Sequence, residues 1–162
     1  MPRVEVQAAR ESRTQCGVRG VAFYDGAMTG EHPLLLFDGE CSLCSSAVQF
    51  VLKHERDSEL RFAPLQGEVG RSTLSAHGLD PETLDTLVVV AEGRALVRSD
   101  AAFELVRHLG PWRVLRALRI VPRGLRDWVY DFVAKRRYRW FGKRDACWMP
   151  QPEHRGRFLD VG

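Results

Sequence analysis

The sequence lacks several features that would assign a protein to a familiar class. No apolar run approaches the roughly 20 residues needed to cross a bilayer. The 162 residues contain only four cysteines, too few for a small secreted disulfide scaffold. There is no G-x-S-x-G, G-x-x-x-x-G-K-[ST] or G-x-G-x-x-G motif, and no H-E-x-x-H among the five histidines. These absences argue against a hydrolase elbow, a P-loop, a dinucleotide site and a zincin helix.

The first 32 residues also lack a secretory signal, because charged residues interrupt any apolar segment. We therefore interpret the protein as cytoplasmic. Neither helical nor alternating periodicity is present in 1–32, which predicts a poorly ordered extension. Cys16 lies in this extension, and we interpret it as an incidental exposed thiol.

What remains is sufficient for one globular core, since 44% of the residues are hydrophobic and 28% are charged. We expect one domain over 33–150, including a helical extension, followed by a tail over 151–162. The net charge of +3 conceals an asymmetry: 107–144 holds 12 Lys/Arg against 2 Asp/Glu, a local +10, which leaves −7 for the rest.

Apolar patterning predicts the elements in order. Strands are expected at 34–37, 61–65, 86–91 and 95–97, and helices at 41–55, 68–77 and from 99 or 100 to 109. Two right-handed crossovers would make the first three strands parallel, with a hairpin adding an antiparallel fourth at the edge. This β-α-β-α-β-β-α order predicts an α/β, thioredoxin-like three-layer fold. Two more helices are expected, around 112–118 and 125–133.

Cys41 and Cys44 stand three residues apart where the first strand turns into a helix. Residues at this spacing are neighbours on the helix surface, so the two thiols can form a disulfide. The helix N-terminus favours a thiolate, and we expect the more N-terminal, more exposed sulfur to be the nucleophile. Cys41 would attack a substrate disulfide, and Cys44 would resolve the mixed disulfide.

Other interpretations of the pair stay open. It could be structural, or it could supply two of the four ligands of a zinc or iron–sulfur site, with Cys147 and either His154 or His32 completing the set. Spacing gives no support for such a set, so we predict no metal and no cofactor. Cys147 is either a third redox thiol or an ordinary packed cysteine.

Asp38 and Gly39 separate the first strand from the dithiol. Asp38 can accept a hydrogen bond from the turn, cap the helix, or take a proton during thiol exchange. With Glu40 it would also raise the pKa of the thiols if the carboxylates lie close. Gly39 allows a sharp turn that fixes where Cys41 points.

The run D-G-E-C-S-L-C after an apolar strand resembles the D-x-x-C-x-x-C signature of the DCC family of predicted thiol-disulfide oxidoreductases. The resemblance continues through L-V-V-V-A-E-G, S-D-A-A-F, I-V-P-R-G-L-R-D-W-V-Y-D-F-V-A and R-Y-R-W-F-G, covering roughly 33–150. It implies a thioredoxin-like domain with redox activity at Asp38, Cys41 and Cys44. Thioredoxins place a cis-proline just before the third strand, whereas this chain has Asp85 and Thr86 there, with Pro81 the nearest proline.

Arginines recur at near-helical intervals through 113–126, beside Trp112 and Trp128. Such a stripe can bind nucleic acid or an anionic membrane, or steer acidic partners. The apolar positions that alternate with the arginines instead favour a helix with a core-facing apolar stripe and a solvated basic face on its other side. We therefore expect no nucleic acid. We predict disulfide exchange with a protein or small thiol, restored by an unidentified reductant. The alternative is a non-catalytic binding module that holds a partner with its basic C-terminal helices.

Overall fold

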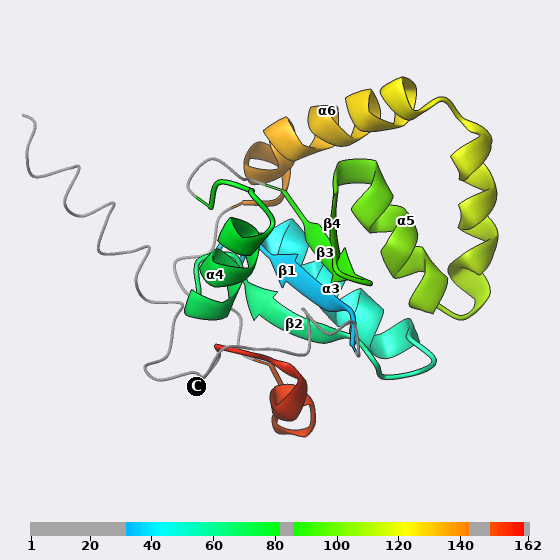
Figure 1. The fold of residues 1–162 in the computed structure, drawn as a ribbon. Helices are drawn as coiled ribbons and strands as arrows, with labels where there is room; N and C mark the ends of the chain where they lie inside the picture. Colours follow the sequence, from blue (N-terminus) through cyan, green and yellow to red (C-terminus); the bar gives the residue numbers. More distant parts are fainter. Residues whose placement is uncertain (1–31, 82–85, 143–149, 161–162) are drawn as a thin grey trace, which may run out of the picture.

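A computed structural model describes residues 32–81, 86–142 and 150–160. It contains four strands, β1 (Leu34–Phe37), β2 (Arg61–Pro64), β3 (Val88–Ala91) and β4 (Arg94–Val97). The α-helices are α3 (Ser42–His54), α4 (Glu68–Ala76), α5 (Arg98–His108) and α6 (Arg123–Phe141). Two 3₁₀ helices, η1 (Pro111–Ile120) and η2 (Pro152–Arg157), complete the described chain (Figure 1).

The four strands form one mixed sheet in the order β2-β1-β3-β4. β1 and β2 are parallel, β3 runs antiparallel to β1, and β4 runs antiparallel to β3. The expectation of three parallel strands was therefore wrong. Leu36 near the end of β1 pairs with Val88 at the start of β3, so the chain enters β3 at the edge where β1 and β2 end. The apolar run that marks β3 fits a parallel strand as well as an antiparallel one. For that reason the sequence did not reveal the direction of β3.

Each face of the sheet is covered, as expected for a strand buried on both sides. On one face, Leu35 and Phe37 of β1 pack in a core cluster with Val48 of α3 and Leu105 of α5. On the other face, alternate residues of β1 pack against Leu74 and its neighbours in α4. The architecture is thus α3 and α5, then the sheet, then α4, which confirms the three-layer thioredoxin-like α/β fold (Figure 1).

The C-terminal segment returns to the sheet. Phe158 is buried, stacks on Phe62 of β2 at 4.8 Å between ring centroids and meets Phe37 edge-on at 6.2 Å. Asp160 accepts a hydrogen bond from the Val69 backbone N–H at 2.5 Å. Part of the segment that we took for a tail therefore contributes to the core.

The segment after α5 differs from expectation in two ways. The helix expected around Trp112, Leu115 and Leu118 is a 3₁₀ helix, whose three-residue turn matches the i, i+3, i+6 spacing of these side chains. The apolar positions that we expected to face the core are exposed on both η1 and α6, with Ile120 91% and Trp128 64% accessible. The cause is that α6 packs on the domain through its polar side chains. No helix among the described residues is long and apolar enough to span a membrane.

Candidate active site

The dithiol lies where β1 passes into α3. A turn over Asp38, Gly39 and Glu40 closes with a Cys41 backbone N–H donating to the Asp38 carbonyl at 3.3 Å. Cys41 is the N-cap residue of α3, and Cys44 lies in the first turn. Both cysteines are free thiols in the structure. The spacing argument thus placed the pair correctly at the start of a helix.

The relative exposure of the two thiols is the reverse of the prediction. Cys41 is fully buried, whereas Cys44 is partly exposed. Arg137 and Tyr138 of α6 contact Asp38 in the turn before Cys41. Because α6 begins about 80 residues after the dithiol, the local motif could not indicate this contact.

Electrostatics nevertheless favours Cys41 as the thiolate. The pKa of Cys41 is lowered to about 6, chiefly by a hydrogen bond that the Cys44 thiol donates. The Cys44 backbone N–H and the charge of Arg137 also lower this pKa, and together these effects outweigh burial, which raises it. The pKa of Cys44 is raised well above its ordinary range, first by the hydrogen bond of its thiol to Cys41 and then by burial. Asp38 raises the pKa of both thiols, as expected for a nearby carboxylate. The two sulfurs thus have different protonation states near neutral pH.

Asp38 is a buried carboxylate that accepts hydrogen bonds through both oxygens. Oδ1 accepts from the Glu40 backbone N–H at 3.0 Å and from Gln66 Nε2 at 2.9 Å. Oδ2 accepts from Arg137 Nη2 at 3.2 Å and from the Tyr138 hydroxyl. Of the predicted roles, the structure shows the turn contact, while α3 has no side-chain cap hydrogen bond. Asp38 therefore joins the turn before the dithiol to α6.

Gln66 is a site residue that sequence reasoning missed. Its Oε1 accepts from the Gly39 backbone N–H at 3.3 Å, while its Nε2 donates to Asp38. The side chain thereby holds the turn after β1 against the loop after β2. A glutamine in a short loop carries no chemical signal of its own, so only the contact across 27 residues reveals it.

Arg137 and Tyr138 were also missed as individual residues. Arg137 is 4% exposed and donates a 3.0 Å hydrogen bond to the Tyr138 hydroxyl. Burial, followed by the bond to Asp38 and its charge, raises the pKa of Tyr138 above its ordinary range, so the hydroxyl stays protonated. The signal available was the R-Y-R-W-F-G run that carried part of the family resemblance. In the sequence, however, Arg137 looks like one more cation in a basic segment.

The backbone just before β3 is held by Tyr130 of α6. The Tyr130 hydroxyl accepts from the Thr86 hydroxyl at 2.8 Å and from the Leu87 backbone N–H at 3.2 Å. Burial, together with the nearby Cys44, raises the pKa of Tyr130. Thr86 thus stands where thioredoxins place a proline, and it is bonded to the same helix that carries Arg137. A cavity of about 530 Å³ opens beside it, lined by Thr86, Tyr130, Lys135 and Tyr138 among others.

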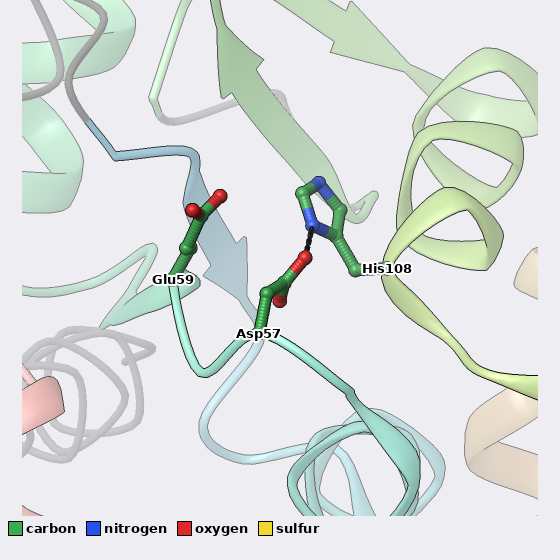
Figure 2. A group of neighbouring side chains, drawn as sticks. All are labelled: Asp57, Glu59 and His108. Carbon is green, nitrogen blue, oxygen red and sulfur yellow. Dashed lines mark hydrogen bonds and ion pairs between the residues drawn. The ribbon is translucent and has the colours of Figure 1, made fainter.

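Cys147, a ligand in the metal alternative, lies outside the described residues. Within 32–81, 86–142 and 150–160, the one group with metal-ligand geometry is Asp57, Glu59 and His108, and it excludes both thiols (Figure 2). His108 Nδ1 bonds Asp57 Oδ2 at 3.0 Å, and the carboxylates are exposed. Arg56 donates its backbone N–H to the His108 carbonyl nearby, so the pair joins the ends of α3 and α5.

Comparison with known proteins gives a family for the chain. A family model described as DCC1-like thiol-disulfide oxidoreductase matches residues 35–143. The chain is 45% identical over 127 residues to the uncharacterized protein YuxK of Bacillus subtilis (strain 168), covering 78% of this chain and 93% of that protein. It is 35% identical over 119 residues to the chloroplastic DCC family protein At1g52590 of Arabidopsis thaliana, covering 72% and 69%. No solved structure matches. The chain belongs to the DCC1-like thiol-disulfide oxidoreductase family.

Proposed function

We propose that the protein exchanges disulfides with a protein or small-thiol partner, with Cys41 as nucleophile and Cys44 as resolving thiol. The observation that carries the proposal is the hydrogen bond from Cys44 to a Cys41 whose pKa is lowered to about 6. Near pH 7 such a group is mostly thiolate, the form that attacks a disulfide. The charge of Arg137 adds to this stabilisation.

The reaction proceeds in two steps. The Cys41 thiolate attacks one sulfur of the substrate disulfide, forming a mixed disulfide and releasing the other sulfur as a thiolate. Cys44 then loses its proton and attacks Cys41 Sγ, which expels the second substrate sulfur. The protein is left with a Cys41–Cys44 disulfide, and the substrate with two thiols. A two-electron reductant, a dithiol or two equivalents of a small thiol, restores the pair.

Burial of Cys41 adds a requirement for access. Because Cys41 is buried whereas Cys44 is partly exposed, the Cys41 sulfur must become accessible before it can meet a substrate disulfide. In a reducing compartment the resting form is the dithiol. The direction of flux there is reduction of the substrate. The roles of Asp38 and Gly39 are to position the turn and, through Asp38, to hold Arg137 near the thiols.

The test is a redox-buffer titration of the purified full chain, read by alkylation and intact mass with peptide mapping. We expect a reversible two-electron transition that maps to Cys41 and Cys44. Cys44→Ser should accumulate a mixed disulfide on Cys41, while Cys41→Ser should abolish turnover. Cys16→Ser is the matched control and should behave as the parent. A pair that stays reduced across the whole range, or a Cys44→Ser variant that traps nothing, refutes the proposal.

The alternative is a binding module that does not use its thiols. It is favoured by one observation, the wide exposed apolar surface of η1 and α6. If this function is the correct one, partner binding is unchanged in both Cys41→Ser and Cys44→Ser.

A further inference from the structure

The helix α6 packs on the domain with its polar side inward. Asp127 accepts from the Ser99 hydroxyl at 2.5 Å, Tyr130 from Thr86, and Arg137 bonds Asp38. These three residues of α6 supply hydrogen bonds to α5, to the entry of β3 and to the turn before the dithiol. An ordinary surface helix buries its apolar stripe and exposes its polar face, and α6 does the opposite.

The outward face of α6 is correspondingly apolar. Leu125, Trp128, Val129 and Phe132 follow the i, i+3, i+4, i+7 spacing of a single helix face, and each is 39–64% exposed. Trp128 and Phe132 are in contact, with ring centroids 5.8 Å apart. Four neighbouring large side chains that the described residues leave exposed make an apolar stripe that a soluble surface rarely leaves in water.

Cations join this stripe in the last turns of α6. The Arg136 guanidinium lies over the Phe132 ring at 3.8 Å from its centroid. On the same helix, Trp140 meets Phe132 at 5.9 Å between centroids, with Arg139 beside it in the sequence. The outward face therefore combines aromatic rings with guanidinium groups.

The preceding 3₁₀ helix, η1, also exposes large apolar side chains. On η1, Val114 is 73% and Ile120 91% exposed. Among the described residues, Phe50 of α3 is the one large exposed apolar side chain outside η1 and α6, and it touches Trp112 of η1 at 5.5 Å between centroids. Figure 1 shows η1 and α6 following each other around the outer side of α5.

Several cations on these elements form no ion pair with another described residue. Within the part of the chain that the structure describes, no ion pair is formed by Arg113, Arg119, Lys135, Arg136 or Arg139. All five are exposed. We call η1 together with the outward face of α6 the basic-apolar surface.

We propose that the basic-apolar surface docks on an anionic lipid membrane, with α6 lying in the plane of the interface. The acyl boundary of a bilayer takes up aliphatic and tryptophan side chains, while its headgroups pair with Arg and Lys. A second copy of the chain would bring two sets of unbalanced cations together. Nucleic acid would pair with the cations, but it offers nothing to Val114, Ile120 or Leu125, because recognition there uses phosphates, stacking and base edges.

The test measures binding of the full chain to vesicles by co-sedimentation and by the blue shift of tryptophan fluorescence. Vesicles of phosphatidylcholine with about one third phosphatidylglycerol should bind, pure phosphatidylcholine vesicles should bind at least about tenfold more weakly, and binding should fall with added salt. Arg136→Gln with Arg139→Gln should weaken partitioning roughly tenfold or more. Trp128→Ser should weaken it by about tenfold through lost apolar burial. Arg94→Gln, at an exposed arginine of the β3–β4 hairpin that is ion-paired with Glu92, is the control outside the surface and should change it less than about twofold.

Three results overturn the proposal. One is no binding to anionic vesicles, and another is binding that the Trp128 and Arg136/Arg139 variants leave unchanged. The third is a chain that self-associates or binds RNA through these residues without binding vesicles, which would assign the surface to a second copy or to nucleic acid. Circular dichroism of each variant separates loss of binding from loss of fold. The substituted side chains are exposed, so we expect the fold to be retained.

Discussion

Arg137 provides the sharpest test of the site, because it is the cation that the fold, and not the motif, brings to the thiols. Removing its charge in Arg137→Met takes away one of the attractions that lower the pKa of Cys41 to about 6. The charge of Arg137 is a smaller cause of the low pKa than the two hydrogen bonds from Cys44, so we expect a rise of about one unit, to about 7, in the variant. At pH 7 the thiolate fraction would then fall from about 90% to about 50%.

The assay is the pH dependence of alkylation of Cys41 by iodoacetamide, with the alkylated residue identified by peptide mapping. In the parent protein the rate should rise with pH through about 6, because deprotonation creates the reactive thiolate. In Arg137→Met the inflection should move to higher pH. Arg136→Met, the exposed neighbour on the same helix, is the matched control and should leave the inflection in place.

A second variant separates charge from structure. Loss of Arg137 leaves the buried Asp38 without its cation, and breaking such a pair costs about 3–5 kcal/mol. Asp38→Asn combined with Arg137→Met removes both charges, and Asp38 itself raises the pKa of Cys41. We therefore expect the double variant to titrate between the parent and Arg137→Met. If Arg137→Met stays folded and its inflection does not move, the electrostatic reasoning is refuted.

Two further predictions concern stability. Gly70→Ala should lower the free energy of unfolding by about 1–3 kcal/mol, because an added Cβ would lie 2.2 Å from the Pro64 carbonyl oxygen. Gly124→Ala is the control and should be neutral or stabilising, because a Cβ there meets nothing within 4 Å. Chemical denaturation measures both. The pKa of Cys41 is lower in the folded state than its ordinary value near 9, so its ionisation contributes stability that is present at about pH 9 and is lost as pH falls through 6. The stability of the reduced protein relative to Cys41→Ser should therefore rise from pH 6 to 9, and an unchanged difference would contradict the assigned shift.

Local sequence patterns were sufficient for the elements and for the dithiol. The run Leu34–Phe37 is buried on both sides of the sheet as its composition predicts. The strand-turn-helix sequence placed Cys41 and Cys44 at the start of α3, where the first-turn N–H groups and the neighbouring thiol lower the pKa of Cys41. Each of these features depends on residues within one strand, one turn or one helix, so the sequence alone determined them.

The tertiary structure decided what depends on residues far apart in the chain. The direction of β3 depends on which edge of the sheet the chain enters, and an apolar run reads alike in both directions. Two hydrogen-bond partners of Asp38 come from α6, which begins about 80 residues later. The apolar spacing of α6 suggested a core-facing helix, yet its polar residues find better partners in Asp38, Thr86 and Ser99. Because buried polar groups must be hydrogen-bonded, those partners fixed the orientation of α6 and left its apolar stripe outside.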